Sequence, residues 1–225
     1  MTETSVDLRS LYGGRRGRVQ FVDVPPLNYL LVAGEGDPSG SAFTDAVRAL
    51  YIVSYRAHLK VKRERGDAAK VMPVEALWWA EDPIHRDLLA AVALGFADFA
   101  DSAHSGRSAD SASSDRGTWR WQAMIVQPEP VDEDVVAQAI TEARSKALPA
   151  LDRLRFERWH EGRAAQLLHV GPYAGEGRAI IALHDAIEAA GCRPRGRHHE
   201  IYLSDPRRTA PENVRTLLRH AVEPG

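Results

Sequence analysis

Cysteine is almost missing from this chain of 225 residues, in which Cys192 is the only one. A single thiol cannot form an intrachain disulfide, and it excludes zinc sites built on two or four cysteines. Cys192 follows a glycine that should end a helix, and no base stands beside it in the sequence. We therefore expect no nucleophilic role for this thiol.

Long apolar runs and an excess of basic charge are also lacking. No segment is long enough to span a bilayer, and the first twenty residues are polar, contain arginines and show no apolar signal core. The net charge of −2 gives no basic surface for nucleic acid. These absences predict a cytoplasmic protein that binds neither nucleic acid nor a membrane. The 44% of hydrophobic residues is ordinary for a globular domain with a real core.

The predicted secondary structure repeats one order, β-α-β-β. Residues 19–35 predict two short strands, or one strand broken at Pro25-Pro26, and a helix follows that Ser39 or Ser41 could cap and that Gly66 ends. Strands are expected over 71–80 and 119–127. The second half has a strand over 163–170, a helix ending at Gly191, and strands over 197–203 and 216–222. One more helix is expected over 132–147, between the halves.

This repeat predicts an α+β fold of two pseudo-twofold-related β-α-β-β modules, with antiparallel sheets around a central ligand groove. We expect a polar lead-in over residues 1–18 and one domain over 19–225, with modules over about 19–130 and 160–222. Residues 84–117 interrupt the first module with an expected helix and a flexible linker rich in Ser, Ala, Asp and Gly. This insertion is either a tolerated surface loop or a lid over the groove.

A glutamate stands in the middle of the strand expected over 197–203. Alternation places His198, Glu200 and Tyr202 on one face and the next residues, starting with His199, on the other. Because an unpaired buried charge is costly, either this face is solvated and Glu200 pairs with an arginine, or the glutamate has a function. Arg197 and Arg219 are the candidate partners. Adjacent histidines point to opposite faces, so we expect no metal site here.

Four segments carry a resemblance to a known family: MPVEALWW (72–79), WRWQAMIVQP (119–128), QLLHVGPY (166–173) and HHEIYLSD (198–205). In this order and spacing they resemble the GyrI-like small-molecule-binding family, from about Val19 to Val222. The glycine-proline-tyrosine turn and the HHEIY strand are most similar to its stand-alone branch, which includes the cyclopropanoid hydrolases. The insertion at 84–117 is longer than the connection expected in that family.

The resemblance implies a groove that binds a planar aromatic or lipophilic small molecule. The expected ligand-binding residues are Trp79, Trp121, Glu75, His198 and Tyr202. Aromatic walls would stack on a planar ligand, and only one of Trp78 and Trp79 can face the groove. Trp119 and Trp121 share a face and are alternatively a packing pair.

The same resemblance implies that the chain adds water to a cyclopropane conjugated to a dienone, which detoxifies a DNA-alkylating compound. Glu200 is the expected base for the water, and Tyr173 is the expected hydrogen-bond donor or positioning group. Glu75 would be a second carboxylate or the partner of a backbone group. This chemistry requires no cofactor and no metal.

Three alternatives remain open at this stage. The chain could bind or sequester planar lipophilic cations without turnover, with the carboxylate recognising their charge. It could act through protein contacts, as gyrase-inhibitor members of the wider family suggest, although the chain is near neutral. A transcription regulator is less favoured, since about 18 residues before the first expected strand are too few for a helix-turn-helix domain. The sequence leaves a homo-oligomer open, and it does not name the physiological substrate.

Overall fold

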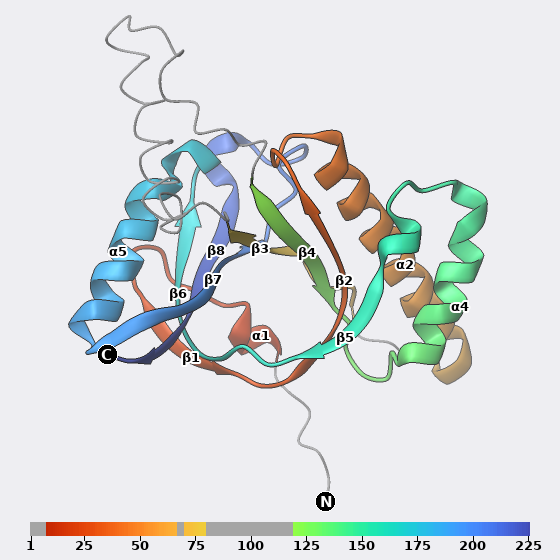
Figure 1. Cartoon of the computed structure of the whole chain (residues 1–225), viewed down its shortest axis with the longest axis horizontal. Helices are drawn as coiled ribbons and strands as arrows, with labels where there is room; N and C mark the ends of the chain where they lie inside the picture. Colours follow the sequence, from red (N-terminus) through yellow and green to blue (C-terminus); the bar gives the residue numbers. More distant parts are fainter. Residues whose placement is uncertain (1–7, 67–69, 80–118) are drawn as a thin grey trace, which may run out of the picture. The chain divides into compact units, whose positions relative to one another are not determined.

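The structure is a computed structural model that describes residues 8–66, 70–79 and 119–225. The chain forms two compact units, and in the described residues unit 1 contains 8–25 and 160–225 while unit 2 contains 26–66, 70–79 and 119–159. Each unit is a sheet of four antiparallel strands with a long helix (Figure 1). The expected α+β class and antiparallel sheets are confirmed. The helix and linker expected over 84–117 lie outside the described residues.

Unit 2 contains the first β-α-β-β repeat. Its elements are β2 (Leu27–Glu35), α2 (Ser41–Arg65), β3 (Glu75–Trp79) and β4 (Arg120–Val126), followed by α4 (Glu133–Ala143) and β5 (Arg155–Trp159). The strand order is β3-β4-β2-β5. Helix α2 packs on this sheet, and α4 packs on α2 (Figure 1).

Unit 1 contains the second repeat. Its elements are α1 (Leu8–Leu11), β1 (Gln20–Val24), β6 (Gly162–Val170), α5 (Glu176–Ala189), β7 (Cys192–Tyr202) and β8 (Arg215–Pro224). The strand order is β1-β6-β8-β7. Helix α5 packs on β6, β7 and β8 (Figure 1).

The two edge strands exchange between the repeats. Strand β1 precedes the first repeat in the chain but pairs with β6, the first strand of the second repeat. Strand β5 precedes the second repeat and pairs with β2, the first strand of the first repeat. Residues 19–35 therefore form two strands, as one of the two expectations had it, and the break at Pro25-Pro26 is also the boundary between the units.

The helix ends follow the sequence signals in part. Gly66 ends α2 in the left-handed conformation, with its N–H bonded to the Lys62 carbonyl, as a glycine after a helix should. Asp132 caps α4 by accepting a hydrogen bond from the Val135 N–H at 2.9 Å. The cap expected for α2 was wrong: Gly40 is the N-cap and makes no side-chain bond.

Among the described residues the two units differ in how many polar side chains they bury: unit 2 buries three, Ser54, Glu75 and Gln127, and unit 1 buries eight. The face of α2 toward its sheet is almost entirely apolar, with Ala46, Leu50, Val53 and Ala57 fully buried. In unit 1 the sheet also buries charged and polar side chains: Glu161, Gln166, Glu176, His198, His199, Thr216, Arg219 and His220. Buried polar groups are costly unless they are paired or functional, so unit 1 is where we place the candidate site. Among the described residues, no helix has the length and apolar character to cross a membrane.

Candidate functional site

Strand β7 holds Glu200 between two side chains of its own face. The Tyr202 hydroxyl donates a hydrogen bond to Glu200 Oε2 at 2.7 Å, and His198 Nε2 lies 3.2 Å from Oε1. The register with β8 pairs these three residues with Thr216, Leu218 and His220, which confirms that they share a face. The Glu200 side chain is 12% exposed. It is thus fixed at both oxygens and still reaches the surface.

This face of β7 lies toward α5 and the short 3-10 turn before it, Tyr173–Gly175. The ring of Tyr173 packs edge-on against that of Tyr202, with the centroids 6.1 Å apart and the planes at 90°. Burial, followed by the negative charges of Glu176, Glu200 and Asp205, raises the pKa of Tyr173 to about 12. Tyr173 therefore keeps its proton at neutral pH and can donate a hydrogen bond.

A second carboxyl, Glu176, belongs to this site and is missing from the sequence-based prediction. It is the first residue of α5, and it is 1% exposed. Burial and repulsion by Glu200 raise the pKa of Glu176 well above its usual value, which the Thr216 hydroxyl only partly offsets. A glutamate in the first turn of a helix is common for electrostatic reasons, so the sequence carries no signal that this one is special.

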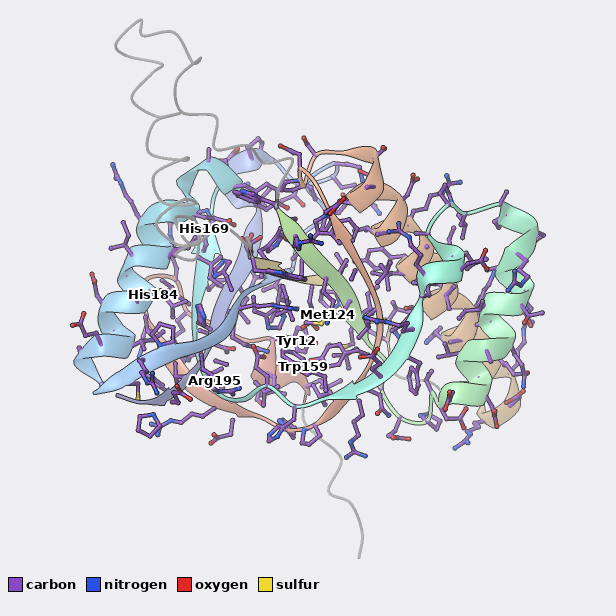
Figure 2. The ribbon with its side chains drawn as sticks, in the orientation of Figure 1. Tyr12, Met124, Trp159, His169, His184 and Arg195 are labelled. Atoms are coloured by element: carbon purple, nitrogen blue, oxygen red, sulfur yellow. The ribbon has the colours of Figure 1, made fainter. Side chains whose placement is uncertain are left out.

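Three histidines line the same layer between α5 and the sheet. The ring of His184, which Figure 2 labels on α5, lies 5.2 Å from that of His220, and the His220 ring lies 6.2 Å from that of His198. Burial, helped by His198 and His184 and opposed by Glu161, lowers the pKa of His220 to about 3. Among the residues described, no group of three or more histidines, cysteines or carboxylates is placed to hold a metal ion.

The neutral state of His220 makes unit 1 sensitive to acid. The unfolded chain protonates this histidine near pH 6.5 and the folded chain only near pH 3, so stability is full above pH 6.5 and falls as the pH drops through this range. Between pH 6.5 and 4.5 this costs roughly 2–3 kcal/mol. We expect His220→Leu to lose less stability over that interval, measured by urea unfolding with far-UV circular dichroism. Equal losses in both proteins would contradict a buried neutral His220.

The opposite face of the same strands carries a separate ion network around Glu161. His199 Nδ1 lies 2.9 Å from Glu161 Oε1, and Arg219 donates to Glu161 Oε2 at 3.1 Å. Arg219 also donates to Gln166 Oε1 at 3.0 Å and to the Leu11 carbonyl. Burial raises the pKa of Glu161, but His199 and Arg219 outweigh it and hold that pKa at about 2.

This network answers two questions that the sequence left open. Arg219 is committed to Glu161 and does not pair with Glu200. His198 and His199 contact different glutamates, which confirms that the two histidines point to opposite faces.

Unit 2 holds the other predicted ligand residues. The register pairs Trp78 with Trp121, and both rings contact Phe43 of α2, at 5.1 and 5.2 Å. Trp121 is fully buried, and a Cβ built on Gly34 would lie 2.4 Å from its ring. The structure therefore places Trp121 in the core beneath α2. The expectation that it faces a groove together with Trp79 is not met, because Trp79 lies on the other face.

Glu75 and Trp79 share the face of the unit 2 sheet that is turned away from Trp78 and Trp121. Glu75 is fully buried. A shallow depression of unit 2 lies elsewhere, at the C-terminal half of α2 and the end of β4, where Ser54, His58, Gln127 and Pro130 line it. No predicted site residue lines that depression.

Comparison with known proteins identifies the family. Residues 120–222 match the family described as the GyrI-like small molecule binding domain. A solved structure described as an uncharacterized conserved protein from Listeria innocua is 30% identical, with 96% of each chain covered and a TM-score of 0.76. The chain belongs to the GyrI-like family. The comparison with curated proteins found no match.

Two further solved structures similar to this GyrI-like chain, both from Listeria innocua, are described as hydrolases. One is 28% identical with a TM-score of 0.73, over 96% of this chain and 97% of the other. The second is 29% identical with a TM-score of 0.74, over 96% of both chains. The GyrI-like match at 120–222 includes β7, which carries Glu200, together with β6 and most of β8.

Proposed function

We propose that this GyrI-like chain is a hydrolase that opens the cyclopropane of planar, DNA-alkylating cyclopropanoid compounds by adding water, and so detoxifies them. The observation that carries this proposal is the Glu200 carboxylate, fixed by Tyr202 and His198 and still reaching the surface. Similar structures described as hydrolases support it.

The chemistry needs a base for water and a donor for the oxygen that becomes negative. Glu200 is the base, because its two hydrogen bonds fix the carboxylate while a lone pair on each oxygen stays available to water. Tyr173 is the donor, since its phenol stays protonated and its ring lies against Tyr202. Trp79 and Glu75 of unit 2 stay predicted ligand residues, whereas Trp121 is left out because it is core.

The proposed reaction needs only water, the substrate and side chains of this chain. The oxygen of water bonds to the ring carbon and gives one proton to Glu200. The ring C–C bond breaks, and its electron pair moves through the dienone to the carbonyl oxygen, which takes a proton from Tyr173 and becomes the oxygen of a phenol. The proton held by Glu200 replaces the one that Tyr173 gave, so the net change is one water added. Fixing the water and the electrophile in one site supplies much of the rate, as in other reactions accelerated by orientation.

The proposal is tested by incubating purified protein with a duocarmycin-type cyclopropane-dienone, followed by mass spectrometry. We expect a product heavier by one water, formed faster than in buffer or with heat-denatured protein. Compound recovered unchanged but bound would favour the second candidate, which the family description supports: a protein that binds or sequesters planar lipophilic molecules. Compound recovered unchanged and unbound would contradict both.

A further inference from the structure

Glu176 is a fully buried carboxyl of the Glu200 layer to which the reaction above gives no role. Its Oε1 is buried and has no hydrogen-bond partner in the part of the chain that the structure describes. A glutamate in that position should be paired, neutral or functional, because an orphaned buried charge is strongly destabilising. Its neighbours favour the neutral form, since burial and Glu200 raise its pKa well above the usual range.

Its position in the chain puts Glu176 beside Tyr173. The Glu176 N–H closes the 3-10 turn by donating to the Tyr173 carbonyl, and residues three apart in such a turn are stacked on one side. The charge of Glu176 is, after burial, the largest influence on the phenol of Tyr173. Glu176 therefore lies beside Tyr173 in the turn and interacts electrostatically with both groups that the proposed reaction uses, Glu200 and Tyr173.

Tyr173 needs such a neighbour to act as a donor. A phenol with a pKa of about 12 is a weaker acid than an ordinary phenol, whose pKa is about 10. It can hydrogen-bond a developing phenolate, but it gives up its proton only if a stronger acid replaces that proton. A neutral carboxyl is such an acid.

We propose that Glu176 stores the proton of the site and relays it between Glu200 and Tyr173. The inference rests on the proposed hydrolase. Water gives a proton to Glu200 as its oxygen bonds to the ring carbon, and Tyr173 gives its proton to the oxygen that the broken C–C bond makes negative. Glu176 then protonates Tyr173 and takes the proton held by Glu200. The site returns to its starting state, and the net change is one water added.

The burial of Glu176 fits a relay better than direct contact with a substrate. The side chain is 1% exposed, whereas Tyr173 and Glu200 are partly exposed. The titratable groups facing this layer are His198, Glu200 and Tyr202 from β7, His220 from β8, His184 from α5, His169 from β6 and Tyr173 and Asp205 from the connecting segments.

The first test needs no turnover. In protein labelled with carbon-13 at the glutamate carboxyls, one resonance that Glu176→Gln removes should titrate well above the ordinary range of glutamates. In Glu200→Gln that midpoint should move down, because the repulsion between the two carboxyls is gone. A Glu176 resonance that titrates in the ordinary range overturns the proposal.

The second test uses turnover. We expect Glu176→Gln to lower kcat by about 10²-fold, in line with the loss of a proton-transfer group. Wild-type turnover should fall as the pH rises through the Glu176 midpoint, and this fall should be absent from the variant. Glu188→Gln, at the exposed end of the same helix, is the control and should change neither.

The outcomes separate the relay from the hydrolase. Wild-type turnover with an unchanged rate and pH profile in Glu176→Gln overturns the relay and leaves the hydrolase standing. No turnover by the wild type overturns the hydrolase and the relay step together, and the carbon-13 titration then shows whether Glu176 holds a proton all the same.

Discussion

Glu200→Gln should lower turnover of a cyclopropane-dienone by roughly 10²–10⁴-fold, the usual contribution of a general base. Glutamine keeps the size of the side chain and an oxygen that accepts the Tyr202 hydrogen bond, now 2.7 Å long, but it cannot take a proton from water. Because only the reactive group is lost, binding of the compound should stay within a few-fold of wild type. Product formation is followed by mass spectrometry and binding by fluorescence titration.

The matched control for this change is Glu212→Gln, in the exposed turn Pro211–Asn213 of the same unit. It removes the same charge without touching the site and should turn over like the wild type. A Glu200→Gln protein that stays folded and keeps wild-type turnover would contradict Glu200 as the base. A variant that loses binding together with turnover would instead indicate that the carboxylate recognises a cationic ligand.

The repeat and the faces of its strands could be predicted because they depend on local patterns. Pro25-Pro26 breaks one strand from the next, Gly66 ends a helix, and the period of two places Glu200 with His198 and Tyr202. The bounds of β7 depend less on local sequence patterns. The strand begins at Cys192, five residues earlier than expected, and a register shift between Arg195 and His198 accommodates Gly196 in a left-handed conformation.

The cross-strand neighbours of a residue could not be predicted from the sequence of its own strand. Alternation separates Trp78 from Trp79, but only the register with β4 shows that Trp121 lies with Trp78 under α2. The exchange of β1 and β5 between the repeats is equally non-local. In the sequence Glu176 is an ordinary glutamate of a first helical turn. Only its burial and the charge of Glu200 show that the pKa of its carboxyl is raised.

The largest effect on folding is expected for the ion network on the opposite face of unit 1. Glu161→Ala leaves Arg219 and His199 buried without the carboxylate that now contacts both, and breaking a buried pair in this way costs about 3–5 kcal/mol. The segment at Leu11 and Gly13 should loosen too, because its carbonyls accept hydrogen bonds from Arg219 and Gln166.

The measurement must report on unit 1. All five tryptophans, Trp78, Trp79, Trp119, Trp121 and Trp159, lie in unit 2, so their fluorescence reports on the other unit. Urea unfolding by far-UV circular dichroism gives the overall loss of stability. Hydrogen exchange of peptides from β7 and β8 should locate that loss in unit 1.

Two comparisons make the Glu161 prediction specific: a variant that removes an exposed ion pair, and the same unfolding measurement at low pH. Glu223→Ala removes an exposed ion pair between Glu223 of β8 and Arg193 of the neighbouring strand β7, and it should cost less than about 1 kcal/mol. The pKa of Glu161 is lowered to about 2, so its contribution is complete above pH 4.5 and is lost as the pH falls toward 2. The difference in the free energy of unfolding between wild type and Glu161→Ala should therefore disappear in that acid range. Two results would contradict stabilisation of unit 1 by the charge of this network. One is a loss of unfolding free energy in Glu161→Ala that is no larger at neutral pH than the loss in Glu223→Ala. The other is a loss in Glu161→Ala that persists at pH 2.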